Sequence, residues 1–264
     1  MTANAALAFT SNQHNVIPLH ALAPRKVVAL SVGTSCSTCN LRELCLPCGL
    51  TEQEIEHMDT LIYTRKSVKR GQNLYRAGDT FHSLYAVRSG FFKSTLLMED
   101  GREQVTGFHM TGEIMGMDGI GSGMYASSAT ALEDGMVCAL PYAHLEDLSR
   151  DMPSLQPHFH RMMSREIVRE QGVMLLLGSM RAEQRLAAFL LNLSQRFAAR
   201  GYSSFEFILR MTREEIGSYL GMKLETVSRT LSKFQEDGLI SVQHRQVSIL
   251  DVAGLNGAVR QILH

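Results

Sequence analysis

The stretch that decides the fold is residues 211–251, MTREEIGSYLGMKLETVSRTLSKFQEDGLISVQHRQVSILD. Thr212 and Glu215 have the spacing of a capping box, which starts a helix, and Gly221 is suited to end that helix. A second helix follows, and its buried face is predicted to consist of Leu224, Val227, Leu231 and Phe234. Apolar residues then alternate on both sides of QHRQ, as they do in a hairpin. The stretch therefore predicts a winged helix-turn-helix.

The opposite face of the second helix is polar. Glu225, Ser228, Arg229 and Ser232 follow one another at steps of three, one and three residues, so they project together from the N-terminal half of the helix. Arginine can donate to two acceptors of guanine, and glutamate can accept from the cytosine amino group. We predict that these residues, together with Thr226, contact DNA, while the hairpin contacts the backbone. The alternative is two ordinary surface helices.

A long helix is predicted over residues 153–180, ahead of an amphipathic helix that Gly201 ends. Its seam repeats at steps of four and three residues, as in a coiled coil, and consists of Phe159, Met163, Ile167, Glu170, Met174 and Leu177. A carboxylate in mid-seam is costly beneath a core but tolerable at a partly wet dimer interface. We therefore predict a homodimer, with packing on the preceding domain as the alternative.

Residues 31–152 are predicted to form an antiparallel β-roll that carries a cysteine-rich loop. Thr51 and Glu54 begin a short helix as a capping box, and short apolar runs punctuated by glycines follow. Strand pairs are predicted to be joined at Ser89-Gly90 and at Asp100-Gly101. Residues 1–30 lack periodicity and are predicted to be a mobile extension. The fold class is α+β, and residues 181–264 form the DNA-binding domain.

Composition limits the function without identifying it. The 264 residues include 26 Lys and Arg and 26 Asp and Glu, so net charge gives no support to a nucleic-acid partner. A hydrophobic content of 45% is enough to bury a core in each of two domains. The sequence holds no signal peptide and no run of about 18 apolar residues, which predicts a cytoplasmic protein without membrane contact. No catalytic set is recognisable, so we expect no enzyme.

Four of the five cysteines fall within the thirteen residues CSTCNLRELCLPC, from Cys36 to Cys48. Such a cluster can be a disulfide staple, a zinc knuckle or a set of ligands to a redox-active group. In a reducing cytosol, clustered cysteines bind metal or catalyse more often than they pair, and a chain of this length needs no staple. The fifth cysteine, Cys138, lies far along the chain.

The order of β-roll, seam-bearing helix and winged helix-turn-helix resembles the CRP/FNR superfamily of bacterial transcription regulators. Cys36, Cys39, Cys45 and Cys138 are similar to the ligand pattern of the FNR subgroup, the oxygen-sensing regulators of fumarate and nitrate reduction. The resemblance implies that these four cysteines hold a [4Fe-4S] cluster without oxygen, that the cluster favours the dimer, and that the dimer binds promoter DNA. It also implies a contact with RNA polymerase in the loop GMDGIGSG, at Asp118, Gly119, Ile120 and Gly121.

Two features bear on alternatives to this function. Cys48 is additional to the subgroup pattern, so a zinc site at Cys36, Cys39, Cys45 and Cys48 stays open, as does a CRP-like regulator that responds through its thiols. No Arg or Lys lies between Glu113 and Leu132, where related receptors bind the phosphate of a cyclic nucleotide. We therefore expect no cyclic nucleotide.

Overall fold

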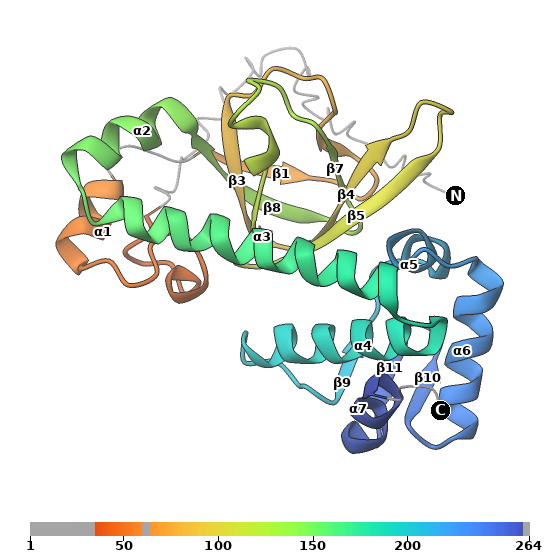
Figure 1. Ribbon diagram of the computed structural model, residues 1–264. Coiled ribbons are helices and arrows are strands. Elements are labelled where there is room, and N and C mark those ends of the chain that lie inside the picture. The colour runs from red at the N-terminus through yellow and green to blue at the C-terminus, as the bar shows by residue number, and fades with distance from the viewer. Residues whose placement is uncertain (1–34, 60–63, 261–264) are drawn as a thin grey trace, which may run out of the picture. The chain divides into compact units, whose positions relative to one another are not determined.

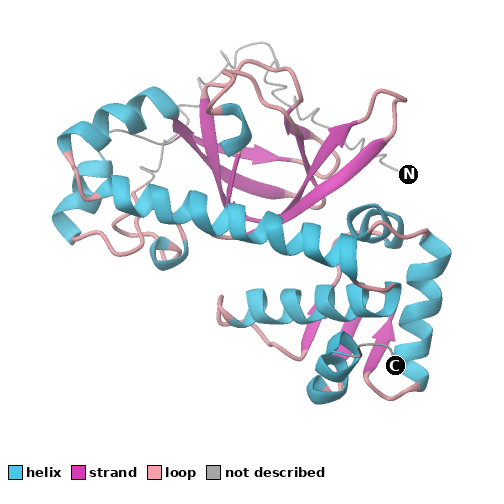
Figure 2. Cartoon of the chain, in the orientation of Figure 1, coloured by secondary structure: helices cyan, strands magenta, loops and turns pink. Residues whose placement is uncertain are grey.

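The computed structural model describes residues 35–59 and 64–260. The N-terminal extension predicted over residues 1–30 lies outside the described residues. The part described is an α+β structure, as expected, with a β-roll followed by helices and a small three-stranded sheet (Figures 1 and 2).

The roll consists of two four-stranded antiparallel sheets. One sheet has the order β1-β8-β3-β6 and is built from Thr64–Val68, Gly135–Pro141, Ser83–Ser89 and Ile114–Met115. The other has the order β2-β7-β4-β5 and is built from Asn73–Tyr75, Ser128–Ala131, Phe91–Leu97 and Glu103–Met110. The loop that precedes the roll contains the 3-10 turn Arg42–Leu44 and helix α1, Glu52–Asp59. The predicted capping box begins α1: the Glu54 amide donates to Thr51 Oγ1, and the Thr51 amide donates to Glu54 Oε2.

The two predicted strand junctions differ in outcome. Asp100-Gly101 joins β4 to β5, whose ends pair at Leu97 and Glu103, so this hairpin is confirmed. Ser89-Gly90 does not join a hairpin, because β3 and β4 belong to different sheets. A Cβ at residue 90 would lie 2.8 Å from the Gly135 Cα, and Gly90 has a φ of 89°. Glycine is therefore needed where the chain crosses between the sheets.

Two consecutive helices follow the roll (Figure 1). The short helix α2, Tyr142–Asp151, follows β8 and was not predicted. The long helix α3, Leu155–Ser179, falls within the predicted range, with Pro157 in its first turn, where proline is tolerated.

The C-terminal part has the predicted helix-turn-helix with additions. Helix α4 is Ala182–Ala198, α5 is Arg213–Leu220 and α6 is Leu224–Glu236. The capping box at Thr212 and Glu215 is present, and Gly221 ends α5 with a φ of 61°. The predicted hairpin is β10, Ile240–Gln243, with β11, Gln246–Ile249. Sequence reasoning missed the third strand β9, Glu206–Ile208, and the last helix α7, Val252–Arg260.

One hydrophobic cluster joins the roll to the C-terminal helices. Phe91 and Phe108 of the roll belong to the same cluster as Leu190 of α4 and Ile216 of α5. The Phe108 side chain is 1% exposed, and its ring meets that of Tyr219 edge-on at 5.1 Å between centroids. The roll and the helix-turn-helix therefore share a core, whereas the composition suggested one core for each domain.

Candidate functional site

The cysteine-rich loop is a series of tight turns fastened to helix α1. The amide of Cys39 donates to the carbonyl of Cys36 at 3.1 Å, and the amide of Cys48 to that of Cys45 at 3.0 Å. The Asp59 carboxylate accepts from the Ser35 hydroxyl at 2.6 Å and from the backbone amide of Cys36. Burial alone would raise the pKa of Asp59, but these hydrogen bonds lower it below its ordinary value, so the anion fixes the start of the loop.

Cys138 reaches the same place from the roll. It lies on β8, which runs between β1 and β3. Cys36, Cys39, Cys45 and Cys138 all line one small hollow, partly open to solvent, which we call the cysteine hollow. The residues lining it do not include Cys48. The structure thus brings together the four cysteines that the resemblance singled out.

The chemistry of the cysteine hollow suits a cationic group. Burial raises the pKa of Cys36 and of Cys45 to about 12, so both are neutral thiols until a cation displaces their protons. Thiolates are ligands of iron-sulfur clusters and of zinc alike. Among residues 35–59 and 64–260, no three His, Cys, Asp or Glu side chains converge on a point that could hold a single metal ion.

Two arginines that sequence reasoning missed stand beside the thiols. Arg88 lines the cysteine hollow, and its Nη1 donates to the Sγ of Cys39 at 3.2 Å. Arg65 is the cross-strand partner of Cys138. Burial raises the pKa of Cys138, and the positive charges of Arg88 and Arg65 oppose that rise. Only the strand pairing, which sequence could not supply, reveals these neighbours.

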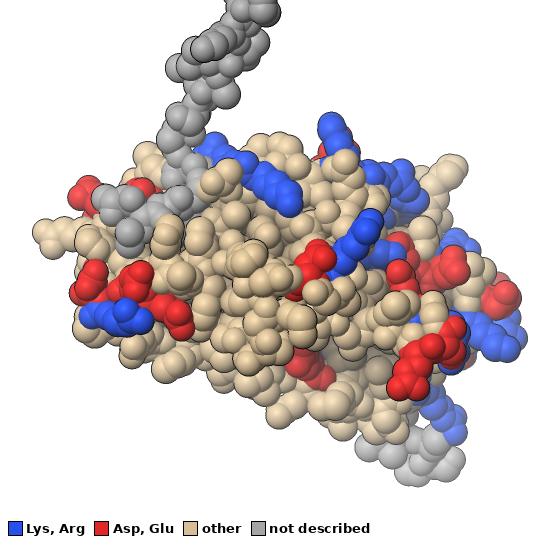
Figure 3. All heavy atoms as spheres, turned by 90° about the horizontal axis from the view of Figure 1, so that it is seen from above, with Lys and Arg blue, Asp and Glu red and all other residues tan. Residues whose placement is uncertain are grey.

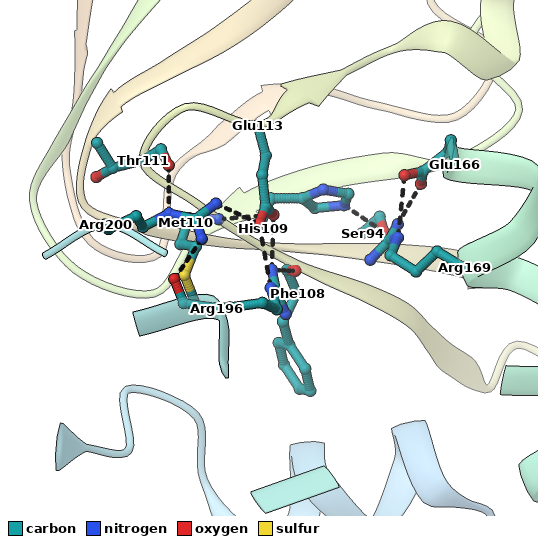
Figure 4. Close-up of polar contacts among 10 residues, drawn as sticks. All are labelled: Ser94, Phe108, His109, Met110, Thr111, Glu113, Glu166, Arg169, Arg196 and Arg200. Carbon is teal, nitrogen blue, oxygen red and sulfur yellow. Dashed lines mark hydrogen bonds and ion pairs between the residues drawn. The ribbon is translucent and has the colours of Figure 1, made fainter. Parts of the chain in front are cut away.

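A second cluster of charged side chains joins the roll to helix α4 (Figure 4). Glu113, between β5 and β6, accepts from Arg196 Nη2 at 2.6 Å and from Arg200 Nη2 at 2.6 Å. The same arginines donate to two roll carbonyls, those of Phe108 and Thr111. Burial would raise the pKa of Glu113, but the two guanidinium groups hold it below its ordinary value. The Glu113 carboxylate is therefore paired with two arginines near the end of α4.

Next to this cluster, Arg169 of the long helix α3 approaches the roll (Figure 4). Arg169 pairs with Glu166 one turn earlier. A Cβ at Gly107 would lie 3.4 Å from Arg169 Nη2 and 2.8 Å from Ser94 Oγ, so glycine leaves room for this approach. Ser94 Oγ is hydrogen bonded to Nε2 of the buried His109 at 3.0 Å. Burial, with Arg169 nearby, lowers the pKa of His109 to about 3, so its ring is neutral.

The predicted dimer seam divides along α3. Phe159 packs against the roll cluster that contains Leu155, while Met163 and Leu177 are half-buried. Ile167 is 53% exposed and Met174 is 66% exposed, and Glu170 between them is exposed. Val168 and Leu175 add further exposed apolar surface on this helix. Ile167, Glu170 and Met174 in the middle of the seam are thus exposed, whereas Phe159 at its start packs against the roll.

The predicted DNA-contacting residues lie on α6 and are accessible. Glu225, Arg229 and Ser232 are exposed, and Thr226 and Ser228 are half-buried. The face beneath them is apolar: Val227, Leu231 and Phe234 are at most 3% exposed. Leu224 was predicted to be buried but is 44% exposed, because it is the first residue of the helix. Arg213 of α5 donates to Ser228 Oγ at 3.1 Å, which adds a cation that the sequence pattern had not singled out.

The loop predicted to contact RNA polymerase is only partly exposed. Asp118 Oδ2 accepts from both the amide and the hydroxyl of Ser127 at 2.7 Å, although the residue as a whole is exposed. Gly119 is buried against the ring of Phe81, Ile120 is half-buried and Gly121 is exposed.

Charge on the surface is mixed. On the face drawn in Figure 3, acidic and basic side chains are interspersed and much of the middle is uncharged. This agrees with the balance of charges in the sequence. None of the described helices combines the length and the apolar character that crossing a membrane would require.

Comparisons with known proteins place both halves of the chain. Residues 65–151 match the model of the cyclic nucleotide-binding domain, and residues 184–258 match that of the Crp-like helix-turn-helix domain. The chain is 48% identical over 237 residues to the transcriptional regulatory protein btr of Bordetella pertussis, covering 90% of this chain and 98% of that protein. It is 45% identical over 241 residues to the fumarate and nitrate reduction regulatory protein of Escherichia coli, covering 90% and 96%.

The same relationship appears among solved structures. The structure of FixK2 from Bradyrhizobium japonicum superposes with a TM-score of 0.70 at 29% identity, and the match covers 77% of this chain and all of that one. With relatives of this identity over nearly their whole length, the chain belongs to the fumarate and nitrate reduction regulator subgroup of the CRP/FNR family of transcription regulators.

Proposed function

We propose that this transcription regulator responds to oxygen through a [4Fe-4S] cluster held by Cys36, Cys39, Cys45 and Cys138, and that the cluster promotes dimerisation and promoter binding. The observation that carries the proposal is the convergence of these four thiols, from a loop and a distant strand, on the cysteine hollow. The relatives named for fumarate and nitrate reduction support an oxygen-related role. When bound, such a cluster supplies sensitivity to oxygen, which destroys it.

The proposed ligands link the cysteine-rich loop to the roll. Three ligands lie on the loop that Asp59 fastens, and the fourth lies on the central strand β8. Loss of the ligated group leaves the loop held only by hydrogen bonds and apolar contacts such as those of Leu46, which is 1% exposed. Because helix α3 packs against the cluster of buried residues that includes Leu46, a change in the loop can reach α3.

The alternative is a zinc site at Cys36, Cys39, Cys45 and Cys48. Cys48 is the residue that distinguishes the two possibilities, because the cysteine hollow is lined by Cys138 and not by Cys48. A local zinc site would require the loop to turn Cys48 inward and would leave Cys138 without a role.

DNA recognition is assigned to α6. We propose that Glu225 and Arg229 read base edges, with Thr226, Ser228 and Ser232 beside them, and that a dimer through α3 sets the spacing of two such helices on a palindrome. The exposed residues Ile167 and Met174 of α3 support this interface. Contact with RNA polymerase through residues 118–121 remains part of the proposal, with Asp118 and Gly121 as the exposed members.

The test is purification and iron-sulfur reconstitution without oxygen, followed by iron and sulfide analysis, visible absorption, sedimentation and binding to a palindromic promoter. We expect about four irons and four sulfides per chain, a visible band that bleaches in air, and loss of dimer and DNA binding on bleaching. A colourless protein that holds one zinc per chain would overturn the proposal.

A matched pair of variants identifies the ligands. Cys138→Ser should abolish iron uptake, whereas Cys48→Ser should retain it, because only the former thiol lines the cysteine hollow. The reverse result would assign the site to the local quartet of cysteines.

A further inference from the structure

Arg88 and Arg65 flank the cysteine hollow without carrying out any step assigned so far. Arg88 Nη1 lies 3.2 Å from the Sγ of Cys39, within hydrogen-bonding distance of sulfur. The Nε of Arg65 is a buried donor that finds no acceptor among the described residues. A buried donor without a partner is rare in a folded protein and calls for an explanation.

The pairing of the strands places both arginines next to the ligands. Cys138 has Arg65 as its cross-strand partner on β1 and Ala86 as its partner on β3. Directly opposed residues have their Cβ atoms about 5 Å apart on the same face of a sheet. Ala86 and Cys138 both line the cysteine hollow, so this face of the sheet forms its wall. Arg88, two residues beyond Ala86 on β3, also lines it.

The charge of the site explains why cations are needed there. Four thiolates around an iron-sulfur core leave a net negative charge, and reduction of the core by one electron adds another. The potential of such a group depends on net charge, on hydrogen bonds to the sulfurs and on exposure to solvent. A guanidinium group stays protonated in proteins and cannot be neutralised by burial in the way a lysine can.

We propose that Arg88, by donating to the Cys39 sulfur, and Arg65, as the cation opposite Cys138, are positioning residues that set the reduction potential and the stability of the metal cluster. The inference rests on the proposed function, because it requires a cluster at these thiols. The side chains do not ligate the group. Arg88 fixes the direction of the Cys39 thiolate and offsets its charge, and Arg65 offsets the charge of the Cys138 thiolate.

The experiment compares Arg88→Met, Arg88→Lys and Arg65→Met with the wild type after anaerobic reconstitution. Arg70→Met is the matched control, since this exposed arginine lies just beyond the same strand, β1, and away from the cysteine hollow. The readouts are the midpoint potential of the cluster by voltammetry and the rate at which an iron chelator removes iron without oxygen. Neither readout depends on DNA binding.

We expect Arg88→Met to shift the potential to more negative values and to speed iron loss about ten- to a hundredfold, the effect of losing one charge-assisted hydrogen bond. Arg65→Met should shift the potential in the same direction. Arg88→Lys keeps the positive charge but loses the planar guanidinium group, so the midpoint potential of its cluster should lie between those of Arg88→Met and the wild type. Arg70→Met should match the wild type.

Each failure has a separate meaning. A wild type that takes up no iron-sulfur cluster contradicts the proposed function itself. A wild type that takes up a cluster, with Arg88→Met and Arg65→Met sharing its potential and its rate of iron loss, overturns this inference and leaves the function standing. Should Arg88→Met fail to fold, as judged by circular dichroism, Arg88→Lys and Arg65→Met decide the question, and unchanged potentials in both would refute it.

Discussion

Replacing Glu113 by Gln should detach the helix-turn-helix from the roll more readily than any exposed charge change at the same interface. The substitution keeps the shape of the side chain and removes the charge that two arginines of the C-terminal part share. Arg196 and Arg200 both lie within 2.6 Å of the Glu113 carboxylate oxygens. In the variant these guanidinium groups would keep their two roll carbonyls but lose their counterion.

The size of the effect follows from burial. The side chains of Arg196, Arg200 and Glu113 are 17%, 8% and 25% exposed. Exposed ion pairs contribute about 0–1 kcal/mol, and breaking a buried pair costs about 3–5 kcal/mol. Since this cluster lies nearer the buried limit, we expect a loss of about 2–4 kcal/mol in the free energy of unfolding at pH 7.

The assay is urea denaturation followed by far-ultraviolet circular dichroism, because the chain contains no tryptophan. Glu133→Gln is the matched control: Glu133 pairs with Arg210 at 3.2 Å across the same interface, but the two side chains are 30% and 40% exposed. The control should lose less than about 1 kcal/mol. Equal losses of unfolding free energy in the two variants would show that the charge of Glu113 does not stabilise this interface.

The pH dependence of the free energy of unfolding tests the same prediction in a second way. Pairing holds the pKa of Glu113 below its ordinary value of 4.5, so its contribution to stability is present above pH 4.5 and is lost as pH falls through the folded-state pKa. The difference between wild type and Glu113→Gln should therefore shrink in acid. A difference that stays constant down to the acid transition would mean that the charge is not its cause.

Four further variants test other parts of the molecule. Replacing Arg229 or Glu225 by Ala should cost about 1–3 kcal/mol at one position of each DNA half-site, measured on a panel of half-site variants, and a uniform loss on all sequences would assign these residues to phosphate or packing. The Glu170→Ala variant should dimerise and bind DNA in air without a cluster, since the substitution removes a carboxylate from between exposed apolar residues of α3. If the variant sediments as a monomer, Glu170 does not control dimerisation. His109→Asn should remove an acid destabilisation of up to about 1.4 kcal/mol per pH unit between pH 6.5 and about 4, because in this range the unfolded chain binds a proton that the buried neutral ring does not bind. An unchanged slope of stability against pH would contradict the lowered pKa of His109.

Local signals accounted for much of the fold. Capping boxes at Thr51 and Thr212 and the left-handed glycine at Gly221 each mark a boundary that the structure contains. These are short-range interactions, so sequence is enough to find them. The helix α7 was missed because it holds Gly254 and Gly257, which disfavour helix; it forms because Leu255, fully buried, packs into the core shared with α4.

The features that sequence did not predict depend on which strands pair over long distances in the chain. Ser89-Gly90 has the composition of a hairpin turn, yet the strands on either side enter different sheets, and only tertiary packing decides between those outcomes. The same holds at the cysteine hollow. The spacing of the cysteines and the family resemblance indicated the four candidate ligands, but Arg88 and Arg65 approach them from strands whose register no sequence pattern encodes.

The position of Cys138 on the central strand β8 affects how the protein is made. Cys138 is 93 residues after Cys45, so at ordinary rates of synthesis the ribosome completes the cysteine-rich loop roughly 5–20 seconds before it adds Cys138. Until β8 pairs with β1 and β3, the nascent loop carries Cys36, Cys39 and Cys45, with Cys48 beside them, but lacks the thiol of Cys138. The proposed ligand set is therefore complete only on a folded roll, and this proposal makes cluster insertion depend on the folding of the roll.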